Sequence, residues 1–305
     1  MMDSTCNPIS SDQPWAFPLA LIQVTGAEAL PFLHNLLTAD LRTLAPPPGT
    51  LETSLAAFLN VQGRVVFTAV VAAANAEHVW LILPEVMRTD AIRHLSRYIL
   101  RTKVRLAPWQ GTIDPAPADP GQEPLPPWHG FIQAAGQGEQ YHLGWPNGWV
   151  LHWAGEAPHP ANTAQSTSSA WAAFHEQEME AGVPWVLPAT NGLFLPQMLN
   201  LERLGGLSMD KGCYPGQEIV ARVHFRGQVK RHLYHGSATQ WLEPGTPLYA
   251  EQATAAQRDS HASGHVVYMA PHGGSWRALL VAEAPGRYCS ASQSSVEANR
   301  TVAPP

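Results

Sequence analysis

The order of the apolar segments between residues 17 and 106 constrains the fold more than any other feature of the sequence. Strand-length apolar runs occur at residues 17–24, 54–60, 64–73, 78–83 and 103–106. Apolar residues recur at helical spacing in 30–37 and 91–99, and Thr25 and Glu28 have the spacing of a capping box before the first helix. The resulting order of strand, helix, three strands, helix and strand is similar to a ferredoxin-like layer with one extra strand.

The middle of the chain divides at changes of composition. Residues 114–127 are rich in Pro, Ala, Asp and Gly, which indicates an irregular connector. We expect short β segments over 131–153 and a loop over 158–169. A helix is expected over 170–181, and Gly182 is placed to end it.

Short strands separated by glycine and proline over 233–283 predict a small antiparallel barrel. The polar residues beyond 290 are expected to fray. The chain is therefore expected to be an α+β protein. Its expected regions are a ferredoxin-like N-terminal region (1–108), a Pro-rich connector (109–128), a middle α+β region (129–232), a C-terminal β-barrel (233–290) and a frayed tail (291–305).

The composition excludes several classes of protein. The 18 lysines and arginines against 24 acidic residues give a net charge of −6, and only Lys103, Lys211 and Lys230 are lysines. This balance argues against a protein whose whole surface coats nucleic acid, although a local basic face stays possible. No apolar run approaches the ~18 residues of a membrane helix, and the N-terminus lacks the pattern of a signal peptide. We therefore expect a cytoplasmic protein without a membrane partner.

The cysteines and the missing motifs narrow the chemistry further. Cys6, Cys213 and Cys289 lie far apart, which is typical of a reducing compartment. Three thiols are one short of a four-cysteine iron–sulfur site, and the 14 histidines include no His-Glu-x-x-His. No resident metal or iron–sulfur cluster is predicted. Phosphate-loop, dinucleotide and Gly-x-Ser-x-Gly motifs are also missing from the sequence.

Residues 211–218 read Lys-Gly-Cys-Tyr-Pro-Gly-Gln-Glu and are unlike the rest of the chain. Gly212 and Gly216 permit backbone angles that other residues resist, and the proline fixes one turn position. With the Lys211 cation and backbone N–H groups nearby, Cys213 is expected to ionise readily and to serve as a nucleophile or soft-metal ligand. The alternative interpretation is a tight structural turn around a small, buried and inert cysteine.

A basic stretch at residues 222–232 follows this segment. If the stretch is a strand, Arg222, His224 and Arg226 face one side. Such a face suits an anion, whether a carboxylate tail, a phosphate or RNA. The alternative is a solvated strand face without a ligand.

The sequence resembles the YgfZ family of folate-binding proteins, which is related to the T-protein (aminomethyltransferase) of the glycine cleavage system. The resemblance rests on residues 194–201, Phe-Leu-Pro-Gln-Met-Leu-Asn-Leu, and on residues 211–218. Asn-Val-Gln-Gly-Arg at 60–64 and the pairs Ala221-Arg222 and Arg226-Gly227 also agree. Weaker agreement extends the resemblance from about residue 19 to residue 283.

The resemblance implies a cloverleaf of three regions around a central opening, in which tetrahydrofolate or a derivative binds. It implies a role in assembling or repairing iron–sulfur clusters, with iron–sulfur proteins or assembly factors as partners. tRNA would be served indirectly, through the iron–sulfur enzymes that modify it. The implied catalytic candidates are Cys213 and Lys211. The supporting motif residues are Gly212, Tyr214, Gly216, Gln217 and Glu218. The ligand or anion candidates are Arg222, Arg226, Asn60 and Gln197.

One departure from the T-protein bears on enzyme activity. T-proteins carry acidic residues just after the Asn-x-Gln-Gly turn, whereas residues 64–68 read Arg-Val-Val-Phe-Thr here. A folate amine needs a nearby carboxylate to steer protons in one-carbon transfer, so these residues count against aminomethyl transfer. Two alternatives to the iron–sulfur role stay open: a folate-dependent one-carbon transferase, and a direct RNA-binding module at 222–232.

Overall fold

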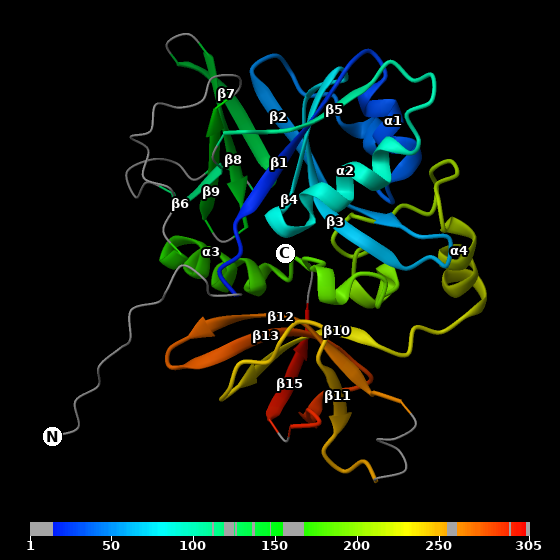
Figure 1. The fold of residues 1–305 in the computed structure, drawn as a ribbon, viewed down its shortest axis with the longest axis vertical. Coiled ribbons are helices and arrows are strands. Elements are labelled where there is room, and N and C mark those ends of the chain that lie inside the picture. Colours follow the sequence, from blue (N-terminus) through cyan, green and yellow to red (C-terminus); the bar gives the residue numbers. More distant parts are fainter. Residues whose placement is uncertain are drawn as a thin grey trace, which may run out of the picture.

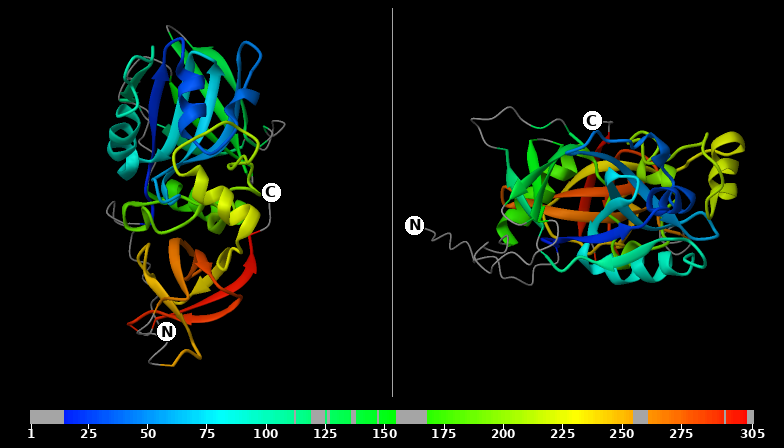
Figure 2. Two further views of the ribbon diagram at one scale, coloured as in Figure 1. Left: turned by 90° about the vertical axis from the view of Figure 1, so that its right-hand side faces the viewer. Right: turned by 90° about the horizontal axis from the view of Figure 1, so that it is seen from above.

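A β-sheet and a β-barrel lie on either side of a helix, and further helices cover the outer face of the sheet (Figure 1). The structure is a computed structural model. It describes residues 15–111, 113–118, 125, 127–135, 138–146, 148–154, 168–254, 261–292 and 294–302. The strands of this part form a nine-stranded antiparallel sheet and a closed six-stranded barrel, with α3 (Ser168–Ala181) between the two (Figures 1 and 2). The architecture is α+β, as the sequence predicts.

The N-terminal elements follow the predicted order. They are β1 (Leu19–Thr25), α1 (Ala29–Leu36), β2 (Thr50–Leu59), β3 (Val65–Asn75), β4 (His78–Pro84), α2 (Arg88–Ser96) and β5 (Arg105–Pro108). Short 3₁₀ turns are η1 (Leu41–Thr43), η2 (Glu85–Met87), η3 (Pro188–Thr190) and η4 (Pro196–Leu199). The strands lie in the order β5-β1-β4-β3-β2.

The predicted capping box of the first helix is wrong. Thr25 belongs to β1, and α1 begins only at Ala29. Gly26, with a φ of 121°, turns the chain out of the strand before the helix starts, so Thr25 is not at the helix end. Glu28 instead accepts a hydrogen bond from the backbone N–H of Lys103 at 2.6 Å, which ties the start of α1 to the chain before β5.

Four further strands extend the same sheet. They are β6 (Ile113–Pro117), β7 (His129–Ala135), β8 (Gly138–Trp145) and β9 (Trp149–Ala154). From β2 the order continues β7-β8-β9-β6, so the strands predicted over 131–153 join the N-terminal sheet. The irregular connector predicted over 114–127 is wrong at its start, because β6 pairs with β9. β6 lies at an edge of the sheet, where Pro115 and Pro117 are tolerated. Of the other expected loop positions, 119–124, 126 and 158–167 lie outside the described residues. The loop predicted to end at residue 169 is wrong at its end, because α3 already begins at Ser168.

The two faces of the sheet pack against different partners. One face packs on α1 and α2, with Ile22 and Phe58 among its buried residues. The other face packs on a tryptophan-rich core that α3 closes. In this core the rings of Tyr141 and Trp153 stack with centroids 5.2 Å apart, and Trp80 meets both edge-on. Each such pair contributes about 0.5–1.5 kcal/mol beyond its buried area.

The barrel lies below α3 and closes with the last described strand. Its strands are β10 (His232–Ala238), β11 (Pro247–Ala250), β12 (Gly264–His272), β13 (Ser275–Ala282), β14 (Gly286–Cys289) and β15 (Ser295–Thr301). The tail predicted to fray over 291–305 is therefore wrong for β15, which pairs with β10 and β14. Val296 and Ala298 alternate with polar residues and bury one side of this strand. Gly182 ends α3 as predicted, and a Cβ there would lie 1.9 Å from Val302.

A row of side chains crosses four strands on the face of β6–β9 opposite the tryptophan core. Asp114, His152, His142 and Phe131 are successive cross-strand partners. The Nδ1 atoms of the two histidines are 2.7 Å apart, so one ring donates and the other accepts. Burial, and after it the charge of His142, lowers the pKa of His152 to about 4.

This histidine pair predicts a loss of stability in mild acid. The unfolded chain binds the His152 proton near pH 6.5 and the folded chain only near pH 4. The contribution of His152 is therefore complete above pH 6.5 and is lost as the pH falls toward 4. We expect the free energy of unfolding in urea to drop by on the order of 1 kcal/mol from this group between pH 7 and 5. His152→Gln should lessen the drop, and His129→Gln, at an exposed histidine, should not. An unchanged pH dependence in His152→Gln would contradict the assignment.

Candidate functional site

The segment around Cys213 forms a turn whose shape follows from its sequence. The carbonyl of Tyr214 accepts a hydrogen bond from the N–H of Gln217 at 3.2 Å, and Gly216 has φ 78° and ψ −1°. These are the features of a type II turn, which favours proline and then glycine at its two central positions. Pro215 and Gly216 occupy those positions, and α4 (Gln217–Arg226) begins directly afterwards. The side chain of Cys213 is exposed just before the turn, so the alternative of a buried cysteine is wrong.

Two glycines bring this turn against the β2–β3 hairpin. A Cβ on Gly216 would lie 2.4 Å from the carbonyl oxygen of Asn60, and one on Gly63 would lie 2.9 Å from Ile219. Both glycines also have left-handed φ angles. The close approach therefore requires glycine on both sides of the contact. Gly212 has no such requirement, because its φ is not left-handed and a Cβ there would meet nothing within 4 Å.

Asn60 shapes the hairpin that the turn contacts. Its side-chain oxygen accepts hydrogen bonds from the N–H groups of Gln62 and Arg64, both at 3.0 Å. The guanidinium of Arg64 then donates to the carbonyl of Leu193 at 2.7 Å. Asn60 is predicted as a ligand residue, but its side-chain oxygen is already hydrogen-bonded within the hairpin.

Gln197 links the 194–201 segment to α4. Its side-chain nitrogen donates to the carbonyl of Val220 at 2.9 Å, and the side chain is buried. Its side-chain oxygen is buried too and has no hydrogen-bond partner among the described residues. Of the four predicted ligand residues, Gln197 is the one with a buried polar atom that lacks a hydrogen-bond partner among the described residues.

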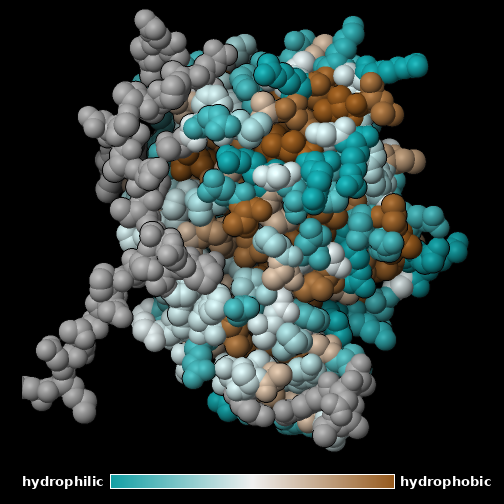
Figure 3. All heavy atoms as spheres, in the orientation of Figure 1, coloured by the Kyte–Doolittle hydropathy of each residue, from teal (hydrophilic) through white to brown (hydrophobic). Residues whose placement is uncertain are grey.

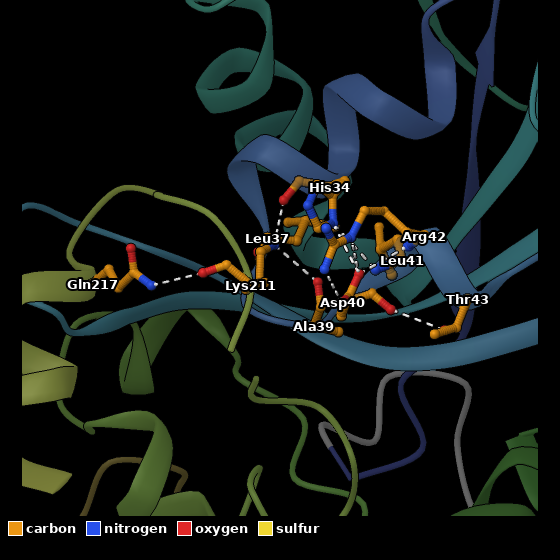
Figure 4. A network of polar contacts seen from close by, with 9 residues as sticks. All are labelled: His34, Leu37, Ala39, Asp40, Leu41, Arg42, Thr43, Lys211 and Gln217. Atoms are coloured by element: carbon orange, nitrogen blue, oxygen red, sulfur yellow. Dashed lines mark hydrogen bonds and ion pairs between the residues drawn. The ribbon is translucent and has the colours of Figure 1, made fainter. Parts of the chain in front are cut away.

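Lys211 binds the end of α1 rather than the thiol. Its ammonium donates to the carbonyl oxygens of His34, of Leu37 at 2.6 Å and of Ala39 at 2.9 Å (Figure 4). Only 5% of the residue is exposed. The last carbonyls of a helix have no partners within the helix and carry partial negative charge. A buried cation there donates hydrogen bonds to them and offsets that charge. Lys211 therefore acts as a cap of α1 from about 175 residues further along the chain.

Burial and neighbouring charges shift the pKa values of the groups around this cap. Burial lowers the pKa of Lys211 to about 8. The guanidinium of Arg42 holds the pKa of Asp40 well below its usual range through two side-chain hydrogen bonds. His34 accepts the N–H of Leu41 on Nδ1, which requires a neutral ring there, and burial lowers its pKa.

Tyr214 packs beneath the Lys211 ammonium, which lies 5.1 Å from the centre of the ring. The hydroxyl is buried and has no hydrogen-bond partner among the described residues. Burial raises the pKa of Tyr214 to about 12, so the phenol is neutral at physiological pH. The residue packs into the core that includes Phe194 and Val220, and its phenol is a weak acid.

The basic stretch at 222–232 begins as a helix, not as the strand considered above. Arg222 and Arg226 lie four residues apart on α4 and still share one side of it. Arg222 pairs with Glu218 at 3.1 Å, but both side chains are more than half exposed, so the pair adds little stability. Phe225 is 72% exposed on the same helix. α4 therefore projects from the molecule, as Figure 1 shows at the right edge.

A cavity that the sequence did not indicate lies between α3 and the barrel. It has a volume of about 350 Å³, and Glu180, His235, His272 and Arg277 contribute to its lining. Arg277 hydrogen-bonds Glu180, and Nδ1 of His272 lies 2.5 Å from Glu176. These residues come from α3 and from strands about 60 to 100 residues later, and no motif joins them, so only the fold could reveal the cavity.

The described part of the chain lacks two other kinds of site. No group of three or more His, Cys, Asp or Glu side chains there could hold a metal ion. No helix among the described residues has the length and hydrophobicity needed to cross a membrane.

The arrangement of sheet, central helix and barrel is that of the glycine cleavage T-protein. The structure matches aminomethyltransferase T of the glycine cleavage system from Bartonella henselae with a TM-score of 0.58. The match covers 93% of this chain and 83% of that chain at 11% sequence identity. At 11% sequence identity, this likeness establishes the fold but not the function.

The sequence comparisons identify a nearer group of relatives. The chain is 28% identical over 264 residues to the tRNA-modifying protein YgfZ of Edwardsiella ictaluri, covering 76% of this chain and 77% of that protein. A stretch of 85 residues is 47% identical to the tRNA-modifying protein YgfZ of Escherichia coli and covers about a quarter of each chain, 27% and 25%. No family model matches the chain. The resemblance to the YgfZ family that residues 194–201 and 211–218 suggested is thus confirmed.

The cap at α1 predicts that two lysines differ strongly in their contribution to the free energy of unfolding. Lys211→Met leaves three buried carbonyls without their donor, and we expect it to lower the free energy of unfolding by about 2–4 kcal/mol. Lys230→Met removes an exposed lysine close to the same segment and should change stability by less than about 0.5 kcal/mol. Urea denaturation of both variants at pH 7 is the measurement. Equal stability of the two variants would show that the cap is not an important contact.

Proposed function

We propose that the chain is a cytoplasmic, tetrahydrofolate-binding protein that supports the assembly or repair of iron–sulfur clusters. Iron–sulfur enzymes that modify tRNA would be among its beneficiaries. The relatives' name, tRNA-modifying protein YgfZ, supports the link to tRNA. The link to clusters and to folate rests on the resemblance at residues 194–201 and 211–218.

One observation carries the proposal: an exposed thiol on a firmly anchored turn. Cys213 faces solvent, while Lys211 two residues before it is bound at the end of α1 and Gly216 three residues after it packs on the β2–β3 hairpin. A thiolate is a natural ligand for iron and a site for transient sulfur chemistry. A fixed and accessible position suits a thiol that meets a partner protein, since little ordering entropy is lost on contact.

A one-carbon transferase is the weaker alternative because the acidic residues of the T-protein are missing from β3. Val65, Val66 and Phe67 are buried apolar residues. The hydroxyl of Thr68, which is also buried, donates to the carbonyl of Pro184 at 2.8 Å and accepts the N–H of Val186 at 3.1 Å. These residues bind the 184–186 segment and provide no carboxylate for proton transfer.

The cavity between α3 and the barrel fits the chemistry of a folate. A carboxylate such as Glu180 matches the neighbouring N–H donors of a pterin ring, and Arg277 matches a glutamate carboxylate. Trp276 adds an aromatic surface, and about 350 Å³ lies in the range of small-molecule sites. Glu180 and Arg277 hydrogen-bond each other in the present structure, so a ligand would have to exchange that ion pair for its own contacts.

The role of the thiol is tested by comparing two cysteines. In a strain that lacks its own copy of this protein, Cys213→Ala should leave tRNA methylthiolation near the level of the deletion, because the exposed ligand is gone. Cys289→Ala changes a buried cysteine of the barrel and should restore the modification. Circular dichroism checks that both variants are folded. Full restoration by Cys213→Ala would refute the proposed role.

Folate binding is tested by titration calorimetry with tetrahydrofolate. We expect Glu180→Gln to weaken binding at least about tenfold, because a lost charged hydrogen bond costs about 1.5–3 kcal/mol. Arg287→Gln lies at other cavities of the barrel and is the control. Weakening by Arg222→Gln with Arg226→Gln, and not by Glu180→Gln, would move the site to α4. Turnover of methylene-tetrahydrofolate by the pure protein would favour the transferase instead.

A further inference from the structure

A second basic surface lies far from Cys213 in the sequence. Six of the 18 lysines and arginines fall between residues 88 and 105, where Asp90 is the one acidic residue. Five of these cations are exposed, and together they are called the arginine face here: Arg93, Arg97, Arg101, Lys103 and Arg105. They come from α2, from the loop after it and from the start of β5. Figure 3 shows hydrophilic side chains gathered around α2 on this side of the molecule.

Two of these cations share one side of α2. Arg93 and Arg97 are four residues apart at its end, with Cβ atoms about 5–6 Å apart. After the helix, Arg101, Lys103 and Arg105 are exposed and the residues between them are half-buried. The chain bends at residues 101 and 103, and the N–H of Val104 donates to the carbonyl of Thr102 at 2.9 Å, so these three cations follow a turning segment that leads into β5.

The charge of this face is largely uncompensated. Arg93 pairs with Asp90 at 2.8 Å. The other four cations form no ion pair with a carboxylate in the described part of the chain. Glu28, the acidic side chain that reaches this loop, accepts the backbone N–H of Lys103. In a chain of net charge −6, such a face is a local positive field that attracts anions.

Exposed apolar side chains stand among the cations. Tyr98 is 41% exposed and Leu100 is 87% exposed. A tyrosine ring at this position offers a surface on which an unpaired base stacks. Leu100 is the one exposed aliphatic side chain between residues 93 and 105, which is too little apolar area for firm insertion into a bilayer.

We propose that the arginine face binds RNA through the phosphate backbone, with Tyr98 stacking on a base. Arginine predominates over lysine in the face, and its planar fork matches phosphate oxygens in pairs. The cations lie close together along one short stretch of chain, and the lack of carboxylate partners among the described residues leaves four of them available for phosphates. The site is independent of the proposed role of Cys213.

The test uses fluorescence anisotropy of a fluorescein-labelled 20-nucleotide single-stranded RNA. Four unpaired cations predict a slope of log K against log salt of about −3 for the wild-type chain between 50 and 200 mM salt. Arg97→Gln with Arg101→Gln should weaken binding at least about tenfold at 50 mM salt and reduce the slope by about 1.4. The second pair, Lys103→Gln with Arg105→Gln, should have the same effect. Thermal unfolding checks that the variants are folded.

A matched control separates the face from net charge. Arg203→Gln with Arg287→Gln removes the same charge from exposed positions outside the face and should change the affinity by less than about twofold. Equal weakening by this control would overturn the proposal. It is also overturned if the wild-type chain binds no RNA, or if only Arg222→Gln with Arg226→Gln weakens binding. Binding to vesicles of anionic lipid without binding to RNA would assign the face to a membrane instead. Because Cys213 is unchanged in every variant, these results are separate from those on the proposed function.

Discussion

The buried ammonium of Lys211 is the contact on which the geometry of the candidate site depends. Burying a charge is costly unless its hydrogen-bonding groups are satisfied, and here three carbonyls at the end of α1 satisfy them. The contact joins the N-terminal layer to a segment about 175 residues later. The approach of Gly216 to Gly63 is a second clamp on the same segment. Between these two contacts, the turn that carries Cys213 is held against α1 and the β2–β3 hairpin.

The sequence predicted local structure well and long-range partners poorly. Apolar periodicity located the N-terminal strands and both helices, and Pro215-Gly216 indicated the turn, because these signals arise from neighbouring residues. The partner of Lys211 was not predictable, since the carbonyls that it binds are determined by packing and not by side-chain type. The same holds for β15, whose polar sequence hides a short alternation of Val296 and Ala298. The predicted roles of the site residues stay predictions.

Three features of the molecule lie on different elements and differ in charge. The thiol stands at an anchored turn, the cavity with Glu180 and Arg277 lies between α3 and the barrel, and the arginine face lies on α2 and β5. A net charge of −6 hides this pattern, because whole-chain sums cannot show where cations gather.

The single sheet that runs from β5 through β2 to β6 has a consequence for experiments that cut the chain. β2 pairs with β7 through residues 50–52 and 129–131, so the strands on either side of the connector are not separate modules. A fragment that ends near residue 108 would leave β2 without a neighbour on one side, with its backbone N–H and C=O groups unpaired. Such an edge is a template for aggregation. Truncated and domain-swapped variants should therefore keep residues 15–154 together.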